Sequence, residues 1–190
     1  MRMVGAMTGR LDAEAWLDAA LRALAEHGPS AVRAEALARA LGVTKGSFYW
    51  HFADMTDFRA RLMTHWRALA YDRFVDSVAE LSDPAQRLRA LARLGVTCGD
   101  PHIGGPSMEP AMRGWGLADP VVRAEVAQVD ALRRAELARL GTAAGLPPQA
   151  AASIYAAVLG LGQQRDLDDA ARLAVIDALL DRWLDADRPA

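Results

Sequence analysis

The segment LARALGVTKGSFYWHF, residues 37–52, predicts two short helices joined by a tight turn. Its apolar residues recur three or four positions apart, as they do along one face of a helix, and Gly42 and Val43 separate the two runs. This is the helix-turn-helix pattern, in which the second helix lies in the major groove of DNA with its first residues at the base edges. The segment therefore indicates a DNA-binding domain whose second helix begins at Thr44 and ends near His51.

These two predicted helices have an apolar side and a polar side. A first helix, from about Asp12 to His27, offers Leu17, Leu21 and Leu24 as the surface on which they pack. We expect six apolar residues to close this small core: Leu37, Ala38, Leu41, Val43, Phe48 and Phe52. The positions that then face outward are Thr44, Lys45, Gly46, Tyr49, Trp50 and His51.

The rest of the chain also reads as helices, so the expected fold class is all-α. The apolar spacing predicts a long connecting helix over residues 54–81 and further helices over residues 84–98, 108–115, 119–140, 149–162 and 168–185. We therefore expect an N-terminal three-helix DNA-binding domain, with a short arm, over residues 1–53. A C-terminal helical domain for ligand binding and dimerisation is expected over residues 54–190.

Composition argues against several classes of protein. No apolar run approaches the ~20 residues that span a membrane, and the N-terminus lacks the pattern of a secretory signal, so we expect no membrane partner and a cytoplasmic location. The single cysteine, Cys98, excludes an internal disulfide and a multi-cysteine zinc site. The net charge is -2, and residues 2–59 contain seven basic and seven acidic side chains. DNA binding must therefore depend on where the charges lie.

Residues 11–58 resemble the DNA-binding domain of TetR-family regulators. The resemblance lies in ALAEHG at the end of the first helix, in LARALGV, and above all in TKGSFYWHF. It implies a homodimer with nine or ten helices per subunit that binds a palindromic operator in double-stranded DNA. It also implies a variable C-terminal domain that usually binds a small-molecule effector and thereby lowers the affinity for DNA.

The first residues of the second helix have both a DNA-binding and a purely structural interpretation. The Thr44 hydroxyl is placed to cap the helix, and the resemblance implies that it also contacts phosphate. Lys45, the only lysine of the chain, is expected to reach a guanine edge or a phosphate; the alternative is a solvated surface lysine. Gly46 costs ~1 kcal/mol inside a helix relative to alanine, which suggests close approach to DNA, or else simple flexibility of the turn.

Three residues at the end of the segment extend this candidate DNA-binding set. The resemblance implies that Tyr49 and His51 contact phosphates, while Tyr49 as part of the core and His51 as a cap of the helix end remain alternatives. Trp50 stands at a position that varies in the family, where it is expected to contact a thymine methyl group or a sugar.

The chain departs from the family pattern at two positions. Met55 stands where a phosphate-binding lysine is common, and Arg33 stands where a serine or threonine usually begins the second helix. Arg33 has no oxygen with which to cap a helix, but its guanidinium is suited to bidentate binding of a phosphate. Arg2 and Arg10, in the N-terminal arm, are candidates for further contacts with DNA, unless the arm is a tag or follows from a misassigned start codon.

In the C-terminal domain, residues 109–140 are similar to one widespread type of TetR-family regulatory domain. In that type the last two long helices pair with their copies in the other subunit as a four-helix bundle. Here the helix over residues 149–162 is rich in alanine and glycine, and the last helix carries a stripe of leucine, isoleucine and tryptophan. We expect these two helices to form the dimer interface.

An apolar ligand pocket is expected between the helices of this domain. Large flexible and aromatic side chains suit such a ligand, although ordinary core packing is an alternative for each of them. The candidates are Trp66, Met108, Met112, Trp115, Tyr155 and Leu159. Cys98 and His102 are too isolated to indicate a metal, and no cofactor is expected.

Two functions fit these observations. The first is a homodimeric transcriptional repressor that a small molecule releases from DNA. The alternative is an all-helical enzyme or ligand-binding protein that retains an unused helix-turn-helix. The sequence contains no catalytic Ser/His/Asp set, metal-spaced His/Glu pair or phosphate-binding glycine loop, which favours the regulator over the enzyme.

Overall fold

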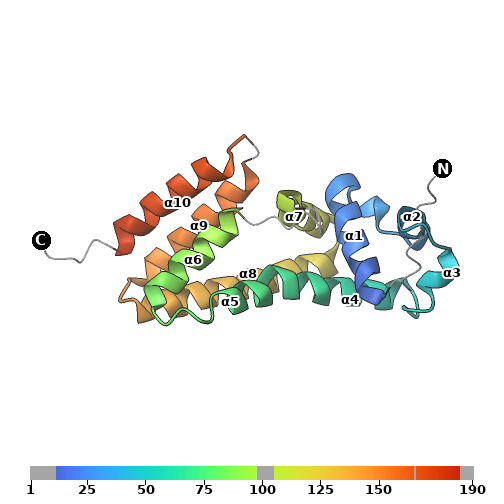
Figure 1. Ribbon diagram of the computed structural model, residues 1–190, viewed down its shortest axis with the longest axis horizontal. Coiled ribbons are helices and arrows are strands. Elements are labelled where there is room, and N and C mark those ends of the chain that lie inside the picture. The colour runs from blue at the N-terminus through green and yellow to red at the C-terminus, as the bar shows by residue number, and fades with distance from the viewer. Residues whose placement is uncertain (1–11, 98–104, 165, 185–190) are drawn as a thin grey trace, which may run out of the picture.

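The computed structural model describes residues 12–97, 105–164 and 166–184, and every regular element in these ranges is a helix (Figure 1). The predicted all-α class is therefore confirmed. In the same ranges no helix is both long and apolar enough to cross a membrane. The candidate residues Arg2, Arg10, Cys98 and His102 lie outside the described residues.

The helices at the N-terminal end closely follow the prediction. Helix α1 covers Ala13–His27, and the Asp12 side chain caps it by accepting a hydrogen bond from the Ala15 N–H. The 3₁₀ turn η1, Pro29–Ala31, leads to α2, Ala34–Ala40. Helix α3 covers only Lys45–Phe48 and is followed by turn residues, so it is shorter than the helix expected to end near His51.

A helical rod of three segments follows. Helix α4, Met55–Arg67, is capped by Asp54, the π-helix η2 covers Ala68–Asp72, and α5 covers Arg73–Ser77. The prediction of one regular helix over residues 54–81 was wrong in two respects, because the middle of the rod is a π-helix and the rod ends at Ser77. A π-helix has a wider turn than an α-helix, and such turns often occur at functional sites.

Six further elements follow in the part of the chain that the structure describes. They are α6 (Pro84–Thr97), the 3₁₀ turn η4 (Gly105–Ser107), α7 (Met108–Ala118), α8 (Pro120–Ala143), α9 (Pro148–Gln163) and α10 (Asp169–Leu184). Helix α7 is one turn longer than predicted. Figure 1 shows α8 running beside the rod of α4 and α5, with α1, α2 and α3 at one end of an elongated molecule and α6, α9 and α10 at the other.

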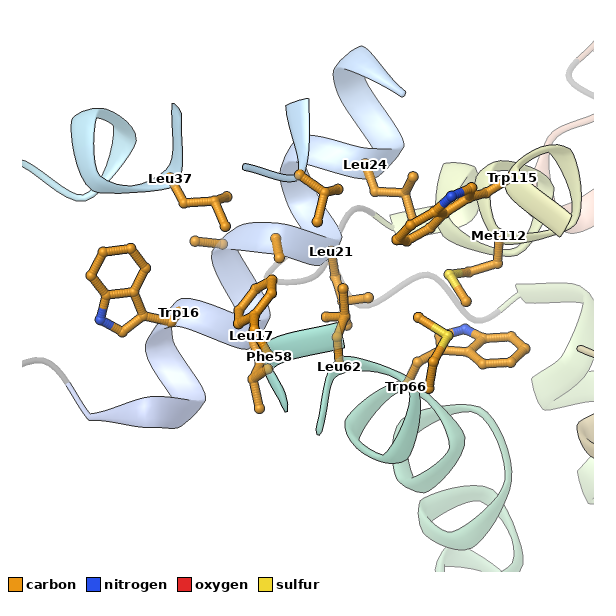
Figure 2. Close-up of a cluster of buried hydrophobic side chains, with 14 of the residues drawn as sticks. Trp16, Leu17, Leu21, Leu24, Leu37, Phe58, Leu62, Trp66, Met112 and Trp115 are labelled. Atoms are coloured by element: carbon orange, nitrogen blue, oxygen red, sulfur yellow. The ribbon is translucent and has the colours of Figure 1, made fainter. Parts of the chain in front are cut away.

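The buried side chains form two hydrophobic clusters. The first joins α1, α2 and α3 to α4, α7 and the first half of α8, and Figure 2 shows Met112 and Trp115 of α7 pointing toward Leu24 of α1 and Trp66 of α4. The second joins α6, α9, α10 and the end of α8. The packing unit at the N-terminal end thus extends past residue 53, and both α4 and α7 pack directly on α1.

The apolar stripe of α10 packs within the chain. Ile176 and Leu180 are fully buried in the second cluster, and Leu173 and Trp183 are partly buried against it. Helices α6 and α9 cover this stripe, so an interface between α10 and another subunit stays a prediction that the stripe itself does not support. Asp177 of α10 also pairs with Arg93 of α6. Any partner of α10 must meet its other face.

Candidate DNA-binding face and ligand cavity

Helix α3 presents one apolar and one exposed side. Phe48 is fully buried, and its ring contacts Trp16 at a centroid distance of 5.4 Å and Phe58 at 5.1 Å. These contacts fix the orientation of the short helix. The opposite side carries five of the six residues predicted to face outward, and His51, the sixth, is partly buried. The five exposed residues are Thr44, Lys45, Gly46, Tyr49 and Trp50. We call these five residues the α3 face.

Trp50 is the most unusual residue of the α3 face. Its side chain is 81% exposed. A tryptophan in water leaves a large apolar area unburied, and conspicuous apolar surface of this kind often marks a binding site. Its ring is free to cover part of a partner molecule.

Tyr49 and His51 lie on either side of Trp50 and are less exposed. Tyr49 is 52% exposed, while its ring meets the buried ring of Phe48 edge-on at 5.3 Å. It is therefore anchored on the core and still open to solvent. His51 is partly buried beside Phe52, with ring centroids 6.2 Å apart.

Lys45 is paired with a residue that the sequence analysis missed. Its ammonium donates a hydrogen bond to the carboxylate of Glu35 on α2. This bond and the charge of the partner raise the pKa of Lys45 and lower that of Glu35. The two residues are ten positions apart on different helices, so only the packing of α3 on α2 brings them together.

The other candidates near α3 have fewer contacts. Thr44 occupies the N-cap position of α3 with an extended backbone, but its hydroxyl makes no capping hydrogen bond, so the predicted cap was wrong. Arg33 is exposed at the corresponding position of α2. Gly46 has room for a side chain, because a Cβ atom there would lie 3.6 Å from Thr44 Oγ1, an ordinary contact. Met55 packs partly buried against the first cluster.

A cavity of about 360 Å³ lies between the π-helix η2, its flanking helices and α6, α8 and α9. Four of the six predicted pocket residues line it: Trp66, Met108, Tyr155 and Leu159. Met112 and Trp115 are instead buried in the first cluster, where Trp115 lies under the Arg59 guanidinium at 5.2 Å. The cavity walls are mostly apolar, with further side chains from Leu69, Phe74, Leu91, Leu137 and Val158.

A network of charged side chains borders the cavity, which Glu109, Arg133 and Tyr155 line. Arg133 of α8 donates two hydrogen bonds to the carbonyl oxygen of Ala70, at 3.0 and 3.1 Å, and binds both carboxylate oxygens of Glu109. Arg113 bridges Glu109 to Asp130, and the Tyr155 hydroxyl donates to Asp130 at 2.6 Å. Sequence analysis identified only Tyr155 of this network, although the four-residue spacing of Glu109 and Arg113 is typical of a helical ion pair.

Burial and hydrogen bonding oppose each other at Asp130 and reinforce each other at Tyr155. Burial would raise the pKa of Asp130, but the hydrogen bonds from Arg113 and Tyr155 and the charges of nearby arginines outweigh it and lower that pKa. Burial and the bond to Asp130 raise the pKa of Tyr155 to about 12. At neutral pH Asp130 is therefore ionised and Tyr155 is neutral.

Polar contacts also tie α4 to its neighbours. His65 Nε2 of α4 lies 2.7 Å from Asp18 Oδ1 of α1. Arg59 of α4 pairs with Asp119, which caps the start of α8. Helix α4 is thus attached to α1 on one side and to the junction of α7 and α8 on the other.

The described residues include no group of three or more His, Cys, Asp or Glu side chains placed to hold a metal ion. The polar groups around the cavity are instead arginine–carboxylate pairs, which suit ligand binding and structural support.

Residues 17–62 match the family model described as "Bacterial regulatory proteins, tetR family". Over 41 residues the chain is 46% identical to the helix-turn-helix transcriptional regulator AcrR of Shigella flexneri. That alignment covers 22% of this chain and 19% of the relative, so the chain spans about a fifth of the length of the curated relative it matches.

Three solved structures share the fold over nearly the whole chain. A transcriptional regulator from Rhodococcus sp. Rha1 has a TM-score of 0.75 at 18% identity, covering 95% of this chain and 100% of that one. A proposed TetR-family regulator from Rhodococcus sp. has a TM-score of 0.72 at 21% identity, with coverages of 90% and 97%. A proposed regulator from Saccharomonospora viridis, solved with choline, has a TM-score of 0.70 at 19% identity, with coverages of 89% and 95%.

Proposed function

The chain belongs to the TetR family of transcriptional regulators, and we propose that it is a homodimeric repressor whose affinity for DNA falls when a small molecule binds in the cavity. The observation that carries this proposal is that two helices, α4 and α7, join the packing around the cavity to the packing under the α3 face.

The α3 face supplies the groups for DNA. Lys45 and Tyr49 offer donors to phosphates or base edges, and Trp50 offers apolar surface to a thymine methyl group or a sugar. Arg33 lies at the start of α2, where a guanidinium suits a phosphate. In a two-fold dimer the two α3 helices must lie about 34–36 Å apart to enter successive major grooves, so the expected operator is a palindrome.

Exposed small residues on α9 and α10 support dimerisation through these helices. Along α9 the stripe Ala152, Ala156 and Gly160 faces solvent at four-residue spacing. A Cβ atom at Gly160 would meet nothing within 4 Å. On α10 the outer face carries Ala174, Val175 and Ala178. Small side chains allow two helices to approach closely, and a second copy of the chain has the same surface to offer.

The proposed response to an effector uses α4 and α7. Met108 and Glu109 of α7 line the cavity, and Trp115 of the same helix packs in the cluster that holds α1. Trp66 of α4 both lines the cavity and packs in the cluster that holds α1. A ligand that moves either helix therefore changes the position of α1 and of the α3 face, and with it the spacing of the two α3 helices in a dimer. A neighbour of this fold holds choline, which is consistent with a small-molecule site.

The test is binding of the purified protein to the DNA upstream of its own gene, measured by fluorescence anisotropy at low and moderate salt. A specific complex of one dimer per site, competed poorly by unrelated DNA, is the expected result. A folded dimer that shows no preference for this DNA at any salt concentration would count against an autoregulatory repressor. Salt must be varied because phosphate contacts dominate non-specific binding.

A further inference from the structure

We propose that the effector is an amphipathic acid whose carboxylate binds Arg172 while its apolar body fills the cavity. This inference deepens the proposed function and depends on it, because it assigns a chemical class to the ligand of the same cavity. Two observations support it: the buried Arg172 has a donor without a hydrogen-bond partner, and the acidic side chains that line the cavity are already paired with arginines.

Arg172 lies in the first turn of α10 and lines the cavity. It is only 9% exposed, and among the described residues it is the one charged side chain classed with the core. Nη1 donates to Asp169 at 3.0 Å and Nη2 to the carbonyl oxygen of Gln164 at 2.7 Å. Nε is buried and has no hydrogen-bond partner within the described part of the chain.

A buried donor without a partner is unfavourable, and a charged donor more so. Guanidinium groups bind carboxylates through parallel N–H bonds, which is a geometry that an ammonium group lacks. The Asp169 carboxylate is largely exposed and neutralises Arg172 from the solvent side. An acidic group entering from the cavity would supply the missing acceptor.

The acidic residues of the cavity are already satisfied. Glu109 receives hydrogen bonds from both Arg113 and Arg133, and Glu136 receives two from Arg139. A cationic ligand would have to compete with these arginines for their partners. Of the charged lining residues that the structure describes, Arg172 is the one whose unused donor is buried, so the charge pattern favours an anion over a cation.

The remaining walls favour an apolar body. Leu91, Leu137, Val158 and Leu159 line the cavity with Phe74, and burial of a hydrocarbon chain against them is favourable by ~25 cal/mol per Å² of apolar surface. A polar acid such as a sugar acid would leave its hydroxyl groups facing these walls. A hydrocarbon chain with one terminal carboxylate would pack against the apolar walls and also supply an acceptor to Arg172.

The test compares three probes of the same chain length, decanoate, 1-decanol and decyltrimethylammonium, by calorimetric titration of the full-length protein. We expect decanoate to bind more tightly than the alcohol or the cation. The Arg172→Gln variant should bind decanoate about tenfold to a hundredfold more weakly and the alcohol almost unchanged. Arg172→Lys keeps the charge and should recover part of the affinity. Arg182→Gln, an exposed substitution on the same helix, is the matched control.

Equal or tighter binding of the alcohol or the cation, or decanoate affinity unchanged in a folded Arg172→Gln variant, would overturn the assignment of an acid. Absence of binding by all three probes would overturn it too. If Arg172→Gln fails to fold, the order of affinities of the three probes for the unaltered protein still decides the question. Operator binding by the same unaltered protein without any probe is measured in parallel, so a failure of the repressor proposal remains distinguishable.

Discussion

Lys45 Nζ donates a hydrogen bond to Glu35 Oε1, so the only lysine of the chain is held by a carboxylate on the neighbouring helix. Both side chains are exposed on the side of the molecule proposed to meet DNA. A phosphate or a guanine edge must therefore compete with Glu35 for the ammonium. Glu35 also places a negative charge close to the DNA backbone, which lowers affinity for any sequence.

Replacing Glu35 by glutamine should strengthen DNA binding. The substitution keeps the size of the side chain and removes its charge, so Lys45 becomes available and one repulsive charge disappears. An exposed ion pair has a small effect, and we expect roughly twofold to fivefold tighter binding at low salt. The dependence of log K on log salt should become steeper by up to about one unit. Fluorescence anisotropy across a salt series measures both quantities.

Glu80→Gln is the matched control, because Glu80 is an exposed carboxylate in the turn after α5. Figure 1 shows α5 far from α3 along the molecule. It makes the same change in net charge and should leave affinity almost unaltered. If the two variants gain affinity equally, only the net charge matters and the Lys45–Glu35 pair plays no part.

Lys45→Ala and Tyr49→Phe should each weaken operator binding without lowering stability. Both side chains are exposed, and neither substitution removes a group from the core. We expect a loss of about tenfold for Lys45→Ala and a smaller loss for Tyr49→Phe, which removes one hydroxyl. Thermal unfolding should change little. A marked fall in the melting temperature would mean that these side chains support the fold instead of the DNA contact.

Gly46→Ala tests whether DNA approaches the backbone of α3 closely. A Cβ atom meets only Thr44 Oγ1 at an ordinary distance, so the free protein should accept alanine and gain up to about 1 kcal/mol in stability. If DNA contacts the backbone there, the methyl group should weaken binding by about tenfold. Gly114→Ala on α7, also with open space around it, should raise stability without touching DNA affinity. Undiminished DNA binding by Gly46→Ala would show that its role is conformational.

The helices of the α1–α3 region could be predicted because caps and apolar spacing within short segments of the sequence determine them. Asp12 caps α1, and the spacing of Phe48 and Phe52 places both rings in the core, as the sequence indicates. The Lys45–Glu35 pair was not predictable in this way, because it depends on how α2 and α3 cross. Helical spacing identifies the face of each helix but leaves open which side chains of two faces meet.

The rod and the cavity depended on residues distant in sequence. Residues 68–72 continue an ordinary apolar pattern, yet they form a π-helix whose Ala70 carbonyl accepts from Arg133, 63 positions away. Likewise, Met112 and Trp115 have the composition of pocket residues but pack on the DNA-binding end. Apolar spacing alone does not distinguish a helix side that meets a cavity from one that meets another helix.

The charged network at the cavity should make stability depend on acid pH. Because the folded pKa of Asp130 lies below its value in the unfolded chain, its ionised form contributes stability above about pH 4, and this contribution is lost as pH falls through the folded pKa. Asp130→Asn should therefore cost about 1–3 kcal/mol at pH 7. The difference in the free energy of unfolding between Asp130→Asn and the unaltered protein should shrink near pH 2, as measured by urea unfolding.

Asp76→Asn, at an exposed position of α5, is the control for a general effect of net charge. It should have almost no effect on stability at either pH. A stability difference for Asp130→Asn that stayed constant from pH 7 to pH 2 would mean that lost packing, and not lost charge, destabilises that variant.

Ala156→Arg should prevent dimerisation while leaving the subunit folded. Ala156 lies on the exposed stripe of α9, between Ala152 and Gly160, where a long charged side chain has room in a single subunit but would be forced between two closely packed helices. Light scattering should show a monomer with unchanged helical content, and operator affinity should fall by at least about a hundredfold, because one subunit reaches only one half-site. Ala124→Arg, on an exposed part of α8, should remain dimeric. If Ala156→Arg is still a dimer, α9 does not form the interface, and the exposed Leu117 and Val121 at the junction of α7 and α8 become the candidate contact surface.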